Sequence, residues 1–139
     1  MNLNKIYLCF KVNTIHQALK ITSICKNNKI IPIFFIQFYI INGLGPNWII
    51  EFRNLLLQKF NKNKFKLFVD CRINYGLFIN LVQNKIDYLK VSGDKDTLLR
   101  LTQIAKKNKI SINPQITVID LTKIKNIETK INKLLLKRK

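Results

Sequence analysis

The strongest constraint on this chain is an alternation of two apolar patterns. Five short runs are rich in β-branched and aromatic residues, and each is followed by a segment whose apolar residues recur every three or four positions. Such alternation is typical of successive βα units and a parallel sheet. The sequence therefore predicts an α/β fold of about five βα units, in an open three-layer sheet or a half-barrel. The predicted strands are residues 5–11, 30–39, 64–69, 87–91 and 110–112.

A C-terminal helix is predicted in residues 116–139, which end in the basic stretch "LLLKRK". We therefore expect residues 1–115 to form a single βα-repeat domain and residues 116–139 to pack on it as a helix with a basic tail. The apolar residues at helical spacing are Leu121, Ile124, Ile127, Ile131, Leu134 and Leu135.

No stretch of the sequence is long and apolar enough to cross a membrane as a helix. The most apolar run, residues 30–41, has 12 residues, whereas a span needs about 18. The amino-terminal residues lack the apolar core and small-residue cleavage site of a secretory signal. We therefore expect a cytoplasmic protein, or one from the equivalent compartment of an organelle or endosymbiont.

The chain is strongly basic, with 25 Lys and Arg residues against 7 Asp and Glu and a formal net charge of +18. Such an excess is typical of proteins that bind polyphosphate, which favours RNA or the ribosome as a partner. Codon bias in an AT-rich genome is the alternative, because Ile, Lys and Asn dominate the chain and have A/T-rich codons. Arginine, which suits bidentate phosphate contacts, is scarce. Both interpretations stay open.

The three cysteines, Cys9, Cys25 and Cys71, stand far apart in the sequence, and His16 is the only histidine. A structural zinc site needs four such ligands, so the sequence predicts neither a metal site nor a cofactor. The odd number of cysteines favours reduced thiols. Cys71 and His16 would form a nucleophile and base if the first and third strands were neighbours. A small, buried and unreactive Cys71 is the alternative.

Polar residues that follow the predicted strands are the main candidates for a ligand site. In parallel α/β sheets, ligands bind at the carboxyl ends of the strands, where helix N-termini point unpaired N–H groups. The predicted ligand-binding residues are Gly43, Gly45, Asn47, Arg72, Asn74, Ser92 and Gly93. The other polar residues expected at this edge are Asn13, Thr14, His16, Asn42, Asp70, Cys71, Tyr75, Asp94 and Asn113.

The stretch "NGLGPN", residues 42–47, is the best predicted anion cradle. Two glycines allow close approach of the backbone, Pro46 suits the first helical position, and no carboxylate competes there. A plain turn is the alternative, because the third glycine of the dinucleotide-binding pattern is missing. The stretch "SGDKD", residues 92–96, is a poorer cradle, because its two carboxylates would satisfy the helix end and repel a phosphate.

Asp70 ends the third predicted strand, where (βα) barrel enzymes place general bases. It is therefore the candidate catalytic residue of a lyase or aldolase-like enzyme, with Cys71 as a weaker candidate. Lys11 and Lys90 come near the same edge as amines that would assist it. The alternative is that Asp70 accepts hydrogen bonds from the N–H groups of its own turn.

The cadence of the middle of the chain resembles a family of small uncharacterised proteins common in alphaproteobacteria. The matching elements are "LFVDC", Gly76, "LFINLVQN", "IDYLKVSG" and "LLRLTQIAKKNK", and "GLGPNWIIEF" is similar to a helix start upstream. Arg72 and Asn84 depart from the family pattern, which has glycine at both positions. The cadence also resembles βα units of phosphate-binding (βα) barrels, such as aldolases of the ketodeoxyphosphogluconate type. The resemblance implies the α/β fold and, for the lysines, drift in an AT-rich lineage, but no activity.

The leading functional hypothesis is a binding or accessory domain that holds a small anionic or phosphorylated ligand at the carboxyl-terminal rim of its strands. The alternatives are an RNA- or ribosome-associated basic protein and an enzyme that uses Asp70. An open sheet leaves unpaired edges, so a homodimer is also expected.

Overall fold

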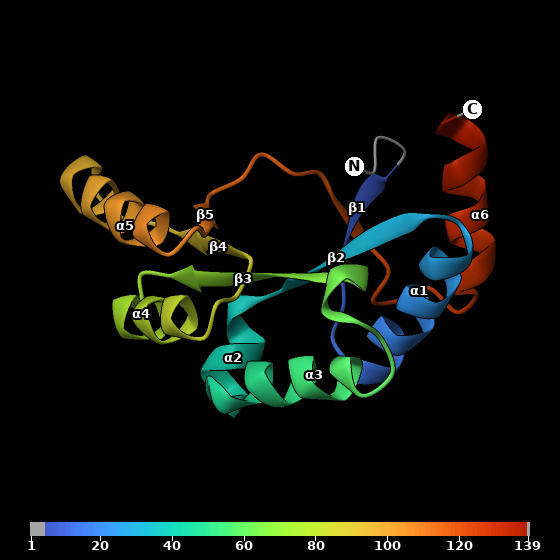
Figure 1. Ribbon diagram of the computed structural model, residues 1–139, viewed down its shortest axis with the longest axis horizontal. Coiled ribbons are helices and arrows are strands. Elements are labelled where there is room, and N and C mark those ends of the chain that lie inside the picture. Colours follow the sequence, from blue (N-terminus) through green and yellow to red (C-terminus); the bar gives the residue numbers. More distant parts are fainter. Residues whose placement is uncertain (1–4, 139) are drawn as a thin grey trace.

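The computed structural model describes residues 5–138 and is an α/β structure with a six-stranded, all-parallel sheet (Figure 1). The predicted fold class is therefore confirmed. The elements are β1 (Ile6–Lys11), α1 (Ile15–Asn27), β2 (Ile30–Ile36), α2 (Phe38–Leu44), α3 (Asn47–Leu57), the 3₁₀ turn η1 (Lys62–Lys64), β3 (Lys66–Arg72), α4 (Tyr75–Gln83), β4 (Tyr88–Val91), α5 (Lys95–Lys107), β5 (Ser111–Ile112), β6 (Val118–Asp120) and α6 (Ile127–Arg138).

The strands lie in the order β5-β4-β3-β2-β1-β6. Consecutive strands from β1 to β5 are neighbours, and β6 returns to pair with the free side of β1. Because β2 lies between β1 and β3, the first and third strands are not neighbours, contrary to the arrangement that a Cys71–His16 pair requires. The register places Phe35 beside Phe68, and Phe68 beside Tyr88.

The two faces of the sheet are covered differently. Side chains alternate along each strand, so Phe10, Phe34 and Val69 face the helices and join one large core with buried residues of all six helices. The opposite face carries a small second cluster around Cys9, Ile33 and Phe68. Figure 1 shows the helices on one side of the sheet, whereas an open three-layer sheet would have helices on both faces. We call the other side the helix-free face.

A single stretch of chain runs over the helix-free face (Figure 1). Residues 113–117, the crossing segment, connect β5 to β6 without a helix and pack Ile116 against the second cluster. Asn113 begins this stretch with a positive φ of 48°. Its side-chain oxygen accepts the N–H of Val91 at 2.9 Å, and its own N–H donates to the Leu89 carbonyl. The crossing segment is thereby anchored to β4.

Three helices end in the same way at the amino-terminal edge of the sheet. An asparagine caps each one, a lysine with positive φ follows, and a buried isoleucine comes next. The left-handed position after a helix usually holds glycine, because a Cβ is strained there. Here the position holds lysine three times. The residues are Lys29 (φ 58°), Lys85 (φ 59°) and Lys109 (φ 59°).

Two parts of the chain differ from the predicted elements. β2 ends at Ile36, Gln37 is extended, and residues 38–44 form α2, in which the adjacent residues Ile40 and Ile41 are both buried. Residues 116–126 were expected within the C-terminal helix. They contain β6 instead, and α6 begins only at Ile127. The predicted helix is thus confirmed for its second half and wrong for its first.

Candidate functional site

An open hollow of about 600 Å³ lies on the helix-free face, toward the carboxyl ends of the strands. Phe35 and Phe68 line it from the sheet, and Pro114 and Ile116 line it from the crossing segment. Its size falls in the range of about 300–1,000 Å³ that is usual for small-molecule sites. Parallel sheets bind ligands at this end of their strands. We call this hollow the ligand cavity.

The floor of the ligand cavity is aromatic. The rings of Phe35 and Phe68 meet edge to face, with centroids 4.9 Å apart and planes at 71°. Tyr88 continues the row on β4, with its ring centroid 6.2 Å from that of Phe68. Edge-to-face pairs at these distances are favourable, and they leave an apolar surface against which the body of a ligand can pack.

A charged pair lies at one wall of the ligand cavity. The Lys11 ammonium, at the end of β1, is 3.4 Å from a carboxylate oxygen of Asp120, at the end of β6. The other carboxylate oxygen accepts the Thr122 hydroxyl at 2.6 Å and the Thr122 N–H at 2.9 Å. These two hydrogen bonds, followed by the charge of Lys11, lower the pKa of Asp120 below its ordinary value.

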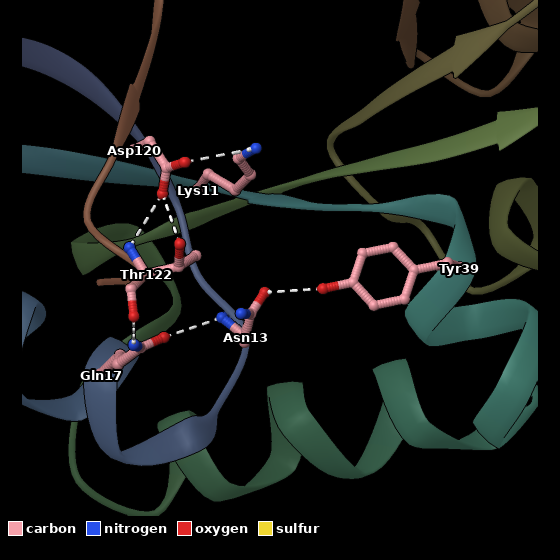
Figure 2. A network of polar contacts seen from close by, with 6 residues as sticks. All are labelled: Lys11, Asn13, Gln17, Tyr39, Asp120 and Thr122. Carbon is pink, nitrogen blue, oxygen red and sulfur yellow. Dashed lines mark hydrogen bonds and ion pairs between the residues drawn. The ribbon is translucent and has the colours of Figure 1, made fainter.

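Figure 2 shows how this wall is connected to the start of α1. The Gln17 side chain accepts the Asn13 N–H at 2.8 Å and donates to the Thr122 carbonyl at 3.1 Å. The Tyr39 hydroxyl donates to the Asn13 side chain at 3.5 Å. Segments after β1, β2 and β6 are therefore tied into one polar network beside the ligand cavity.

Lys90, on β4, is the second cation of the ligand cavity. Its ammonium lies 5.9 Å from the centroid of the Phe35 ring, within the range of a cation–π contact. The described part of the chain gives it no carboxylate within 4 Å, unlike Lys11. Lys90 therefore brings to the cavity a positive charge that is not held in an ion pair within 4 Å among the described residues.

Asp70 lies beside Lys90 in the register of β3 and β4. The alternation along β3 puts it on the face of Phe68. One carboxylate oxygen accepts the N–H of Arg72 at 3.0 Å, within its own turn. A hydrogen bond within its own turn is the role that the sequence offers for Asp70 as the alternative to catalysis.

Cys71 does not have the surroundings of a nucleophile. Its thiol is fully buried on the helix side of β3, and burial raises its pKa to about 12. The only histidine, His16, is exposed on α1, two strands away. Burial also raises the pKa values of Cys9 and Cys25 to about 12, so all three free thiols stay protonated at neutral pH.

The predicted anion cradle at residues 42–47 has a different local structure. Gly43 lies in the last turn of α2, and the N–H of Gly45 donates to the Ile41 carbonyl at 2.7 Å. Asn47 is the first residue of α3, and the next N–H, from Trp48, donates to the Gly45 carbonyl. The stretch is a joint between two helices, and the N–H groups of Gly45 and Trp48 are already used.

The other predicted ligand-binding residues lie in different places. Gly45 and Asn74 line a separate hollow of about 270 Å³ between α2, α3 and α4. Arg72 lies over the Phe38 ring, 5.2 Å from its centroid. Ser92 and Gly93 instead contact Tyr75, whose hydroxyl donates to the Ser92 carbonyl at 2.9 Å. The structure thus brings some of these residues together, outside the ligand cavity.

Side chains close the N-termini of α1, α4 and α5, and also that of α6, where Asn126 accepts the Thr129 N–H at 3.0 Å. Thr14, Asn74 and Asp94 accept the N–H groups of Gln17, Leu77 and Thr97 at 3.2, 3.0 and 2.7 Å. These caps satisfy N–H groups that an anion would otherwise bind. The candidate site therefore depends on side chains of the helix-free face rather than on helix ends.

Sequence reasoning missed Phe35, Phe68 and Asp120 as site residues, and placed Lys11 and Lys90 only near the rim. The aromatic residues look like core in the sequence, and Asp120 fell inside a predicted helix. Side chains alternate between the two faces along residues 30–36. This alternation identifies Phe35 as a site residue only when it is known that one face of the strand lacks helices.

Among the described residues, no group of His, Cys, Asp and Glu side chains is arranged to hold a metal ion, and no helix is long and apolar enough to span a membrane. No protein-family model matches the chain, and a search of curated proteins finds no match either.

Proposed function

We propose that this protein is a binding domain that holds a small organic anion in the ligand cavity. The position of Lys90 is the observation that carries the proposal. Its ammonium lies over an aromatic floor, beside a cavity of suitable size, and has no ion-pair partner in the described chain. A carboxylate or phosphate joined to an apolar or flat body would satisfy the charge and cover the rings.

Lys11 and Asp120 have a different part in this proposal. Asp120 is fixed by Thr122 and holds the Lys11 ammonium at 3.4 Å, so the pair forms a polar wall rather than a free charge. A ligand that carries hydroxyl groups would exchange hydrogen bonds with this wall. Lys90 supplies the charge, Phe35 and Phe68 the apolar contact, and the pair the orientation.

Binding rather than catalysis is favoured by the state of the reactive groups. The three thiols are buried, with pKa values near 12, and the Asp70 carboxylate is engaged by the backbone of its own turn. A nucleophile is normally activated by a neighbouring base or a lowered pKa. The cavity therefore suits recognition of an anion better than covalent chemistry.

The test is a thermal-shift screen of phosphorylated and carboxylated metabolites, followed by calorimetry on the compounds that raise the melting temperature. A ligand at about 100 times its Kd stabilises the folded state by about 2.7 kcal/mol. Lys90→Met removes the charge and keeps the length of the side chain. Because a charged hydrogen bond contributes about 1.5–3 kcal/mol, we expect its affinity to fall at least about tenfold.

Lys20→Met is the matched control, because Lys20 is exposed on α1 and does not line the ligand cavity. We expect its affinity to equal that of the unchanged protein. A panel in which no compound raises the melting temperature would contradict the proposal. Equal affinities for the Lys90→Met and unchanged proteins would contradict it too.

A second candidate function, a lyase or aldolase-like enzyme, is favoured by the register of Asp70 opposite Lys90. An amine beside a carboxylate on the cavity face has the composition of a site that removes a proton next to a carbonyl group. Asp70→Asn would then abolish turnover of carbonyl substrates while leaving calorimetric binding intact. Absence of any turnover by the unchanged protein across such substrates would reject this candidate.

A further inference from the structure

The amino-terminal edge of the sheet, opposite the end with the ligand cavity, carries a row of three hollows lined by basic residues. The first hollow, of about 390 Å³, is lined by Lys5, Lys26, Lys29 and Lys64. It shares Asn63 with a second hollow of about 510 Å³. We call the cations around the three hollows the basic belt.

The second and third hollows continue the basic belt toward β5. The second is lined by Lys62, Lys66 and Lys85, together with Arg53, which donates to the Asn84 carbonyl. The third, of about 250 Å³, shares Lys66 and Lys85 and adds Lys109. The basic belt therefore extends along the starts of strands β1 to β5.

Almost no negative charge faces the basic belt. Asp87 is the only acidic residue that lines any of the three hollows in the described chain. One of its carboxylate oxygens accepts the Leu67 N–H at 2.9 Å, and the other lies 3.8 Å from the Lys66 ammonium. Asp87 is thus already occupied, and the remaining lysines give the edge a concentrated positive charge.

The backbone at three of these lysines is unfavourable for any side chain. Lys29, Lys85 and Lys109 have φ near +59°, where glycine would be unstrained. All three side chains are exposed, and the Lys85 ammonium donates to the Asn108 side chain at 3.0 Å. The helix ending accounts for the left-handed backbone, which glycine would adopt without strain, but not for a lysine at all three positions. Adjacent strands lie about 4.8 Å apart, so the strand order spaces the three lysines along the edge.

We propose that the basic belt binds the phosphate backbone of RNA. One small phosphate ion would fill only one of the three hollows. A polyanion such as RNA carries a series of phosphates and would contact all three connected hollows. Lysine ammonium groups contact phosphates as point charges and do not read bases, so the binding is tolerant of sequence. The ligand cavity lies at the other end of the strands, and the RNA site does not depend on it.

The test compares two triple variants that each remove three positive charges. Lys29→Gly, Lys85→Gly and Lys109→Gly change the basic belt, and glycine at positive φ keeps the backbone unstrained. Lys20→Gln, Lys95→Gln and Lys125→Gln change exposed lysines that line none of the three hollows. RNA binding is measured by fluorescence anisotropy with a labelled duplex and a labelled single strand, over a series of salt concentrations.

We expect the unchanged protein to bind RNA with an affinity that falls steeply with salt. Removal of three phosphate contacts should lower the slope of log K against log salt by about 2–3 in the belt variant, with at least about a tenfold loss of affinity near 0.1 M salt. The control variant should keep its affinity within about twofold, because only contacted phosphates set this slope. Lys90→Met should bind RNA as the unchanged protein does.

Two results would overturn the proposal. One is that the unchanged protein does not bind RNA, and the other is that both triple variants lose affinity equally, which would assign the binding to net charge alone. If the glycine variant fails to fold by circular dichroism, Lys26→Gln, Lys62→Gln and Lys64→Gln replace it, since these lysines also line the belt and are exposed. The same two results then apply.

Discussion

The Lys11 ammonium lies 3.4 Å from the Asp120 carboxylate, and this ion pair joins the end of β1 to the end of β6. β6 has only three residues and reaches its place through the crossing segment, which has no helix to hold it. Its docking on β1 combines a short backbone ladder, the packing of Ile116 and the hydrogen bond from Gln17 to Thr122 with the ion pair of Asp120. The same carboxylate positions Lys11 at the ligand cavity.

Asp120→Ala is expected to destabilise the protein by about 1 kcal/mol at neutral pH, since it removes a solvent-screened ion pair and the hydrogen bonds from Thr122. Thr122 and then Lys11 lower the pKa of the folded carboxylate. Its contribution is therefore present above the unfolded pKa, about 3.9, and is lost as pH falls through the lower folded value.

Urea unfolding of the two proteins as a function of pH measures this difference. Glu51→Ala is the control, because Glu51 is exposed on α3 and forms no ion pair among the described residues. A gap between the Asp120→Ala and unchanged proteins that persists unaltered below the folded pKa would show that charge does not cause it.

Gly93→Ala should cost about 1 kcal/mol, because a Cβ there would lie 2.6 Å from the Tyr75 hydroxyl, which must move and give up its hydrogen bond to Ser92. In the background Tyr75→Phe the same substitution should cost much less. Gly43→Ala is the matched control, since open space surrounds that position in α2, and it should stabilise by about 0.5–1 kcal/mol. Thermal unfolding of the four variants completes the cycle, and a cost for Gly93→Ala that Tyr75→Phe leaves unchanged would refute this explanation.

The fold was predictable from the sequence because strand and helix periods differ, and each buried run shows one of them. The sequence places residues 38 and 39 in a strand because aromatic residues resume there directly after Gln37. In the structure the adjacent residues Ile40 and Ile41 are buried together on one side of a helix, and that burial depends on tertiary packing. β6 was missed because three residues are too short to show a period.

The candidate site was less predictable, because its residues meet through strand order and register. Lys11, Phe35 and Lys90 lie on three different strands, and only the sequential order of β1 to β4 brings them to one cavity. A sequence read strand by strand places polar residues at the carboxyl ends but does not show which face lacks helices. The edge was therefore predicted, whereas the aromatic floor was not.

The cysteines should be unreactive in the folded protein. Burial raises the pKa values of Cys9, Cys25 and Cys71 to about 12, so the thiolate fraction is negligible even at pH 9. Titration with a disulfide reagent should give slow labelling in buffer, and rapid labelling of three thiols per chain in denaturant. Rapid labelling of Cys71 alone in the native protein would instead support a nucleophilic role.

Replacing the positive-φ lysines that follow α4 and α5 by glycine should stabilise the protein. The same replacement of a lysine within a helix should destabilise it. Lys85→Gly and Lys109→Gly each remove a strained Cβ and keep the two hydrogen bonds that close their helices, from residues 85 and 86 and from residues 109 and 110. We expect stabilisation of about 0.5–1 kcal/mol for each, since the strain relieved, about 1–2 kcal/mol, exceeds the added entropy of the unfolded chain. Lys20→Gly, in the middle of α1, should destabilise by about 1 kcal/mol.

Denaturant unfolding at a salt concentration high enough to screen charge repulsion separates the backbone effect from the charge effect. Destabilisation by both Lys85→Gly and Lys109→Gly would mean that their side chains stabilise the fold, and the strain would then need no functional explanation.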